Sequence, residues 1–267
     1  MGKRGTIKHL KRIYAPRNWM LSKVGGIWAT KPSQGPHKLR ECMPLLVLLR
    51  NKLKLALTGR EAKLIIKAKE GNIAVDGKIR KDVKYPVGFM DVISILKANL
   101  NYRILYDVKG RFGLVKISKE ESKYKLCRVK ERLMGPKKIP YIITNDGRTL
   151  RFPNPDIKRH DTIKLNLDTN EIVEYYKYKI GANVMITGGN NIGRSGIIVD
   201  IEKHPGSYEI VYVKDNRDKE FSTRLGNVFV IGDKKAEVSL LKNHTRYSII
   251  EERERNASKK KSEEEEE

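Results

Sequence analysis

The sequence contains few residues that could bind a metal or form a disulfide. Its 267 residues include two cysteines, Cys42 and Cys127, and five histidines. The cysteines lie far apart and the histidines are scattered, so neither a standard zinc-ligand spacing nor a disulfide framework is present. We therefore expect no metal site, no cofactor and a reducing compartment.

Long apolar runs are also missing. No apolar stretch approaches the roughly 18 residues that a membrane-spanning helix needs. The first residues include Lys3 and Arg4 but no apolar core, so we expect neither a membrane anchor nor a secretory signal.

Acidic residues are scarce in the first part of the chain. Overall, 56 Lys and Arg stand against 32 Asp and Glu, a formal net charge of +24. Residues 1–54 hold thirteen basic residues and one acid, Glu41, so half of the net charge lies there. An excess of this size favours a polyanionic partner, nucleic acid first and an anionic membrane surface second. The last five residues are all Glu, and we expect them to be solvated and disordered.

Residues 1–41 show neither helical nor strand periodicity. Tyr14, Trp19 and Trp28 stand among cations, prolines and glycines. Such a segment cannot bury enough apolar surface to fold alone. It is either a disordered tail or a segment ordered against a partner, where aromatic rings stack and cations pair with phosphates.

A compact α+β module follows. Leucines at helical spacing after Cys42 predict one helix, and Thr58-Gly59-Arg60-Glu61 is a capping box that opens a second. Asp76-Gly77 is the preferred two-residue turn of a β-hairpin, and Val92–Ile95 is a further strand.

From residue 102 onward, short strands separated by turn signals predict two small β domains. The second, which begins at Gly181, is expected to form an SH3-like barrel. A helix is expected near 249–255. The expected strands are 102–106, 112–117, 141–144, 149–152, 163–167, 171–175, 183–187, 196–201, 208–213, 220–224 and 227–231.

The loop from Ile186 to Gly196 nearly matches a phosphate-binding P-loop, because Gly188 starts the pattern Gly, four residues, Gly, Arg, Ser. A P-loop needs a helix directly after it, whereas the residues after Ser195 are β-branched and predict a strand. Nucleotide hydrolysis is therefore not expected. The strand, glycine-rich turn and strand instead resemble the KOW motif, whose loop we expect to face RNA.

The helix–helix–hairpin module resembles the alpha-L RNA-binding domain, and the sequence around it resembles the eukaryotic and archaeal small-subunit ribosomal protein S-four family. The resemblance spans residues 3 to about 232 and weakens after Gly232. The motifs that carry it include His9-Leu10-Lys11-Arg12, Trp19-Met20-Leu21, Gly35-Pro36-His37-Lys38-Leu39-Arg40-Glu41-Cys42, Gly88-Phe89-Met90-Asp91-Val92, Lys109-Gly110-Arg111-Phe112 and His204-Pro205-Gly206-Ser207.

The resemblance implies a multi-domain α+β protein with five parts. They are a basic rRNA-binding extension (1–41), the alpha-L domain (42–104), a central β domain (105–176), a KOW barrel of the SH3-like type (177–232), and a C-terminal helix with a charged tail (233–267).

It also implies a non-catalytic constituent of the small ribosomal subunit, which binds and stabilises small-subunit rRNA during assembly and translation. The expected partners are that rRNA and neighbouring small-subunit proteins, with the chain a monomer within the ribosome. No membrane and no small-molecule substrate is expected. The expected location is the cytoplasm, with assembly in the nucleolus or nucleus.

RNA contacts are expected from three regions, although for any single lysine the alternative is a solvated charge. In the extension they are Lys8, Lys11, Arg12, Arg17, Trp19, Lys23 and Trp28. In the alpha-L region they are Lys38, Arg40, Arg50, Lys54, Arg60 and Lys63, and in the KOW turn Asn190, Asn191 and Arg194.

Two other functions are compatible with parts of the sequence. An RNA-modifying enzyme such as a pseudouridine synthase also carries an alpha-L domain, but it needs an aspartate in a sizeable catalytic domain. Asp146 and Asp168 both lie in expected turns and are explained by turn chemistry. A KOW-containing transcription-elongation factor is disfavoured by the alpha-L module and by the basic extension.

Overall fold

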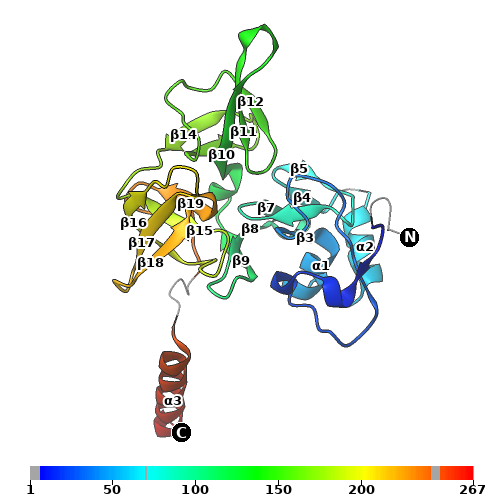
Figure 1. Cartoon of the computed structure of the whole chain (residues 1–267). Helices are drawn as coiled ribbons and strands as arrows, with labels where there is room; N and C mark the ends of the chain where they lie inside the picture. The colour runs from blue at the N-terminus through cyan, green and yellow to red at the C-terminus, as the bar shows by residue number, and fades with distance from the viewer. Residues whose placement is uncertain (1–6, 70, 242–246, 267) are drawn as a thin grey trace, which may run out of the picture.

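The computed structural model describes residues 7–69, 71–241 and 247–266. Figure 1 shows three lobes: a module with the short helices on the right, a β lobe at the top and a second β lobe on the left. Each lobe is built on one five-stranded antiparallel sheet, and two further two-stranded sheets lie in the first module. The fold is therefore α+β with several sheets, as expected.

The N-terminal segment folds onto the first module. Strand β1 (Leu10–Lys11) pairs with β2 (Trp28–Ala29), and two 3₁₀ turns, η1 (Arg12–Tyr14) and η2 (Arg17–Trp19), lie between them. Trp19 is fully buried, and its indole N–H donates to the Cys42 carbonyl at 2.6 Å. Neither a disordered tail nor order imposed by a partner describes residues 7–41, because the chain itself orders them. Residues 1–6 of the extension lie outside the described residues.

The first helical segment is shorter than its leucine spacing predicts. Strand β3 (Cys42–Pro44) pairs with β6 (Pro86–Gly88), and α1 (Leu45–Val47) begins only after that strand. It continues as a π-helical turn, η3 (Leu48–Lys52), and the left-handed Lys54 (φ 54°) follows. Strand pairing therefore takes the first three residues of the expected helix.

The second helix, α2 (Gly59–Lys67), starts where the capping box predicts. Thr58 Oγ1 accepts from the Glu61 N–H at 3.3 Å, and the Glu61 carboxylate accepts from the Thr58 N–H at 3.4 Å. Because these bonds satisfy backbone N–H groups that the helix cannot pair internally, the N-terminal boundary could be set by local sequence alone.

The sheet of the first module has the order β5-β4-β7-β8-β9. Asp76 and Gly77 both have positive φ, as a type I′ turn requires. Strand β8 crosses residue 104, where we expected a domain limit, and β9 continues the same sheet. The strands are β4 (Ile73–Val75), β5 (Lys78–Ile79), β7 (Val92–Ile95), β8 (Leu100–Tyr106) and β9 (Phe112–Ile117).

The upper lobe has the strand order β12-β11-β10-β13-β14. Its long strand β10 (Tyr124–Met134) pairs with β13 through its first half and with β11 through its second. Sequence patterning missed β10 because basic residues interrupt its apolar positions. The other strands are β11 (Pro140–Thr144), β12 (Thr149–Arg151), β13 (Thr162–Asn166) and β14 (Ile172–Tyr176).

The left lobe has the strand order β18-β17-β16-β15-β19, and all five of its expected strands are present. Strands β18 and β19 form the two edges of the sheet. The strands are β15 (Asn183–Ile186), β16 (Ser195–Glu202), β17 (Ile210–Asp215), β18 (Glu220–Arg224) and β19 (Val228–Gly232).

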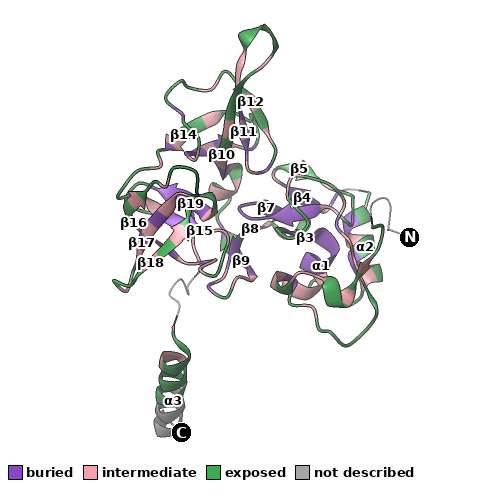
Figure 2. Cartoon of the chain, in the orientation of Figure 1, coloured by how far each residue is buried: buried purple, intermediate pink, exposed green. Residues whose placement is uncertain are grey.

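Helix α3 (Ile249–Glu266) is longer than expected. The expected disordered glutamate tail is helical as far as Glu266, and Glu267 lies outside the described residues. Ser248 Oγ accepts from the Glu251 N–H, and the Glu251 carboxylate accepts from the Ser248 N–H. This second capping box starts a segment rich in good helix formers. Figure 2 shows α3 projecting below the lobes, with its described residues largely exposed. Its first turn still contacts them, because Glu251 pairs with Lys219 and Glu252 with Lys109, both at 2.8 Å.

The lobes are held together by a shared core and by a buried ionic cluster. Phe89 of the first module packs edge-on against Phe229 of β19, with ring centroids 5.0 Å apart. The fully buried Lys125 donates to Asp76 and Asp91 of the first module at 2.9 and 2.6 Å, and to Asp146 of the upper lobe at 3.1 Å. Lys125, on β10 of the upper lobe, therefore links two lobes. Asp146 helps to hold this lysine from within the upper lobe, a role beyond the turn that its sequence position predicts.

Candidate RNA-binding surface

A groove on the first module gathers six lysines around one exposed tryptophan. We call it the lysine groove; its volume is about 540 Å³. It also includes His9 and a single acid, Asp82. The lysines are Lys8, Lys31, Lys63, Lys67, Lys81 and Lys84.

Pairing of β1 with β2 and the spacing of α2 build this groove. The strand pairing places Lys11 opposite Trp28, whose side chain remains 58% exposed, with its ring 5.5 Å from that of His9. Lys63 and Lys67 are one helical turn apart on α2 and therefore share a face. An exposed indole among cations offers stacking to a base and charge to its phosphates.

The one acid in the groove, Asp82, is already hydrogen-bonded within the protein. Asp82 accepts from the Ser33 hydroxyl and from the Lys84 N–H, both at 2.9 Å. Its carboxylate therefore orders the loop around it, and the six lysines outweigh its charge. The groove is left with a strong positive excess.

A second basic hollow lies at the end of the first helical segment, with a volume of about 410 Å³. We call it the Arg50 hollow; it contains Arg50, Lys52 and Lys54 and no acidic side chain. Burial lowers the pKa of Lys52, and the nearby Arg111 lowers it further. A bound anion would oppose both effects, so the site favours negatively charged ligands.

Most of the other predicted contacts are exposed on the first module. Arg12 is half-buried and holds its own loop together, because its guanidinium donates to the carbonyls of Ser22 and Gly25. Lys38 lies at the junction of the lobes, and Asn190 at the tip of the glycine loop. The exposed set is Lys11, Arg17, Lys23, Lys38, Arg40, Arg60 and Asn190.

Three predicted contacts have side chains that are engaged within the protein itself. Trp19 is 0% exposed and forms part of the core, so its ring is not available to stack on a base. Arg194 pairs with Asp215 at 3.1 Å and lies over the Phe221 ring at 3.8 Å. Its neighbour Asn191 accepts a bond from the same guanidinium. These side chains build the lobe, and we do not include them in the interface.

The glycine loop itself is a packing element. A Cβ on Gly193 would overlap the carbonyl of Asp107, in the turn between β8 and β9. Ser195 then begins β16 directly, so the residue after the loop starts a strand, as expected, instead of the helix that a P-loop requires. Glycine is needed here to let two lobes approach each other.

Several lysines of the surface were not predicted. Lys67 had a usable signal, because it follows the predicted Lys63 by one helical turn. Lys31, Lys52, Lys81 and Lys84 had none, since they reach the two hollows only through tertiary packing.

In the part of the chain that the structure describes, no three His, Cys, Asp or Glu side chains form a group that could hold a metal. Within the same residues, no helix is both long and apolar enough to span a membrane.

Five family models match successive parts of the chain. They are described as the RS4NT (NUC023) domain (4–40), the S4 domain (43–93), ribosomal family S4e (98–172), the KOW motif (180–214) and the 40S ribosomal protein S4 C-terminus (215–260). The last match extends the resemblance past residue 232, where we expected it to weaken.

Relatives cover nearly the whole chain. Small ribosomal subunit protein eS4A of Schizosaccharomyces pombe is 55% identical over 94% of this chain and 96% of its own. Small ribosomal subunit protein eS4 of Bombyx mori is 53% identical over 96% and 98%. The crystal structure of 30S ribosomal protein S4e from Thermoplasma acidophilum is 34% identical, covers 74% of this chain and 99% of its own, and superposes with a TM-score of 0.63. The chain therefore belongs to the S4e family of ribosomal proteins.

Proposed function

We propose that this protein binds small-subunit rRNA through the lysine groove and the Arg50 hollow. As a member of the S4e family, it is a structural constituent of the small ribosomal subunit and not an enzyme. The observation that carries the proposal is the exposed Trp28 among six lysines. This is the combination of stacking platform and basic groove that single-stranded RNA requires.

The proposed mechanism is charge neutralisation and positioning. Each lysine that contacts a phosphate releases condensed counterions, which allows RNA segments to approach one another. Trp28 stacks on an unpaired base and fixes the register of the strand. The neighbouring small-subunit proteins, the monomeric state within the ribosome and the assembly in the nucleolus or nucleus belong to the same proposal.

The groove is tested by binding of the purified full-length protein to small-subunit rRNA. Trp28→Ala should weaken binding by about 1–3 kcal/mol, the range for loss of one base–aromatic stack. Lys63→Ala should make the slope of log affinity against log salt shallower by about 0.7–0.9 for each lost phosphate contact. Lys116→Ala, an exposed lysine on β9 away from both hollows, is the matched control. Unchanged binding by both groove variants would assign the RNA to another surface.

Incorporation into the subunit is tested by sedimentation of a native extract in low and high salt. We expect the protein to migrate with small subunits and whole ribosomes after salt has removed loosely bound factors. Migration near the top of the gradient, as a free protein, would contradict the proposed function as a whole.

A further inference from the structure

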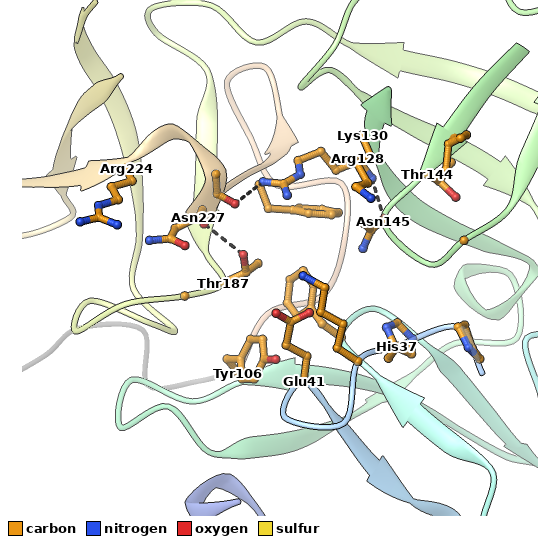
Figure 3. Close-up of a pocket in the computed structure, with 18 of the residues that line it drawn as sticks. His37, Glu41, Tyr106, Arg128, Lys130, Thr144, Asn145, Thr187, Arg224 and Asn227 are labelled. Carbon is orange, nitrogen blue, oxygen red and sulfur yellow. Dashed lines mark hydrogen bonds between the residues drawn. The ribbon is translucent and has the colours of Figure 1, made fainter. Parts of the chain in front are cut away.

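A third cavity lies where all three lobes meet, away from the lysine groove. Its volume is about 590 Å³, within the range of pockets that hold small ligands. We call it the junction cleft. Its walls come from the first module, the upper lobe and the left lobe, so it exists only when the three lobes are docked. Figure 3 shows Arg128 and Asn145 on one side, Thr187 and Asn227 on another, and Glu41 and Tyr106 on a third.

The cleft carries four cations against one acid, Glu41. None of the four has an ion-pair partner among the described residues, in contrast to Lys125, Arg148 and Arg194 elsewhere in the chain. The cations are Lys38, Arg128, Lys130 and Arg224. Unpaired positive charge in a concave site attracts an anion.

Hydrogen bonds position Arg128, and an irregularity in strand pairing positions Lys130. Arg128 Nη1 donates to the carbonyls of Gly226 and Val228 at 2.7 and 2.9 Å, so the left lobe fixes its guanidinium. Its buried Nε has no hydrogen-bond partner among the described residues. Lys130 lies at the irregularity in the pairing of β10 with β11, between Val129 and Glu131. Such a bulge redirects a side chain from its regular place on the strand.

The deep part of the cleft is aromatic. Phe89 stacks on Tyr106 with centroids 5.3 Å apart, and Phe229 meets Phe89 edge-on. All three are at most 5% exposed, so they are fixed by the core. Apolar ring edges beneath a basic rim match a ligand with a flat aromatic part and a phosphate.

Amide groups line the space between floor and rim. Asn145 Oδ1 accepts from the Arg128 N–H at 3.0 Å, which leaves its amide N–H groups without a partner among the described residues. The Asn227 backbone carbonyl accepts two bonds from Thr187, while its side-chain amide has no described partner. A Cβ on Gly188 would lie 2.6 Å from Asn227 Oδ1, so the glycine loop also keeps this amide accessible.

We propose that the junction cleft binds one unpaired nucleotide that protrudes from an RNA strand. Its phosphate lies on Arg128 and Lys130, and its base faces the aromatic floor within reach of Asn145 and Asn227. A continuous duplex is too wide for a cavity of this volume, whereas an extruded nucleotide fits and presents base edges to the amides. The inference rests on the proposed RNA-binding function and adds a site to it.

The test compares two RNA hairpins of one sequence, of which one has a single unpaired nucleotide bulging from its stem. A fluorescent base analogue at the bulge reports its burial. The full-length protein should bind the bulged hairpin about tenfold more tightly, as the loss or gain of one stacked base implies. Lys130→Ala and Asn227→Ala should abolish most of this preference. Among the described residues neither side chain has a hydrogen-bond or ion-pair partner whose loss would destabilise the protein, and Lys130 is exposed.

Lys203→Ala, which removes an exposed cation of the left lobe outside the cleft, should keep the full preference. Equal binding of the two hairpins by the wild type, or an unchanged preference in both cleft variants, overturns the proposal. Competition by free adenosine monophosphate at micromolar concentration would also overturn it, because the ligand would then be a free nucleotide. Any of these three results leaves the proposed function unaffected if the protein still sediments with small subunits.

Discussion

At the scale of single residues, the glycines of the loop after β15 show how a phosphate-binding pattern can serve packing instead. Gly193 has φ 82°, and a Cβ there would overlap the Asp107 backbone. Gly206 has a similar φ, 78°, but nothing lies within 4 Å of its position. Substitution at Gly206 therefore tests the effect of backbone conformation alone, whereas substitution at Gly193 adds the effect of steric overlap with Asp107.

Gly193→Ala should therefore destabilise the protein more than Gly206→Ala. The left-handed conformation alone costs about 1–2 kcal/mol for a residue with a Cβ, which is the whole effect expected at Gly206. At Gly193 the overlap adds about 1–3 kcal/mol of strain. Urea unfolding of the two variants measures the difference, and equal losses would show that the loop does not depend on close contact with Asp107.

The buried Lys125 should contribute strongly to the free energy of unfolding. Replacing one partner of a buried ionic cluster leaves the others uncompensated, which costs about 3–5 kcal/mol. Lys125→Met should lower the free energy of unfolding by that amount, because Asp76, Asp91 and Asp146 remain. Lys164→Met, which breaks pairs with the exposed Glu174 and Glu237, should cost less than about 1 kcal/mol. Similar losses in the two variants would mean that the buried cluster adds little to stability.

At the scale of elements, local sequence rules set the ends of helices and hairpins better than their interiors. The capping box at Thr58 and the hairpin turn at Asp76-Gly77 lie where the sequence predicts them. Both depend on bonds within four residues. The start of the first helical segment was mispredicted because Cys42–Pro44 pair with β6, which is distant in sequence. Strand β10 was missed because basic residues interrupt its apolar positions, and its partners β11 and β13 lie further along the chain.

Thr58→Ala should lower the free energy of unfolding by about 0.5–2 kcal/mol, because the Glu61 N–H loses its acceptor. Thr58→Ser keeps the hydroxyl and should retain most of the stability. Thermal unfolding followed by circular dichroism measures both variants. If Ser and Ala are equally destabilising, the cap hydroxyl is not what starts α2.

At the scale of the whole molecule, the buried ionic cluster ties the docking of lobes to pH. Burial alone would raise the pKa of Asp91, but His37 and Lys125 overcome it and lower the value to about 2. The pKa of Asp146 is also lowered: burial opposes the shift, and Lys125, Thr144 and Arg148 outweigh it. Because the pKa values of both carboxyl groups are lower in the folded state than the unfolded value of about 3.9, their contribution to stability is fully present above that pH and is lost below it.

The free energy of unfolding should therefore fall as pH drops from about 5 towards 2, by about 2 kcal/mol for Asp91 alone. Urea titrations at several pH values in this window measure the loss. Asp91→Asn removes one titrating group. The free energy of unfolding of this variant should therefore be lower at pH 6 than that of the wild type, but it should fall less steeply as the pH drops. If the free energy of unfolding of that variant falls as steeply in acid as that of the wild type, groups other than Asp91 cause the pH dependence.

By itself, the sequence determined the class of partner, the family and the local turns. Net charge selects a polyanion whatever the fold, and the motifs and capping boxes lie within short stretches of chain. Tertiary structure alone decided that Trp19 is core while Trp28 is exposed, although both stand among cations. It also brought Lys31, Lys81 and Lys84 to α2 and formed the junction cleft from three lobes. Periodicity and spacing describe near neighbours, whereas burial and the grouping of charges depend on contacts between residues far apart in the chain.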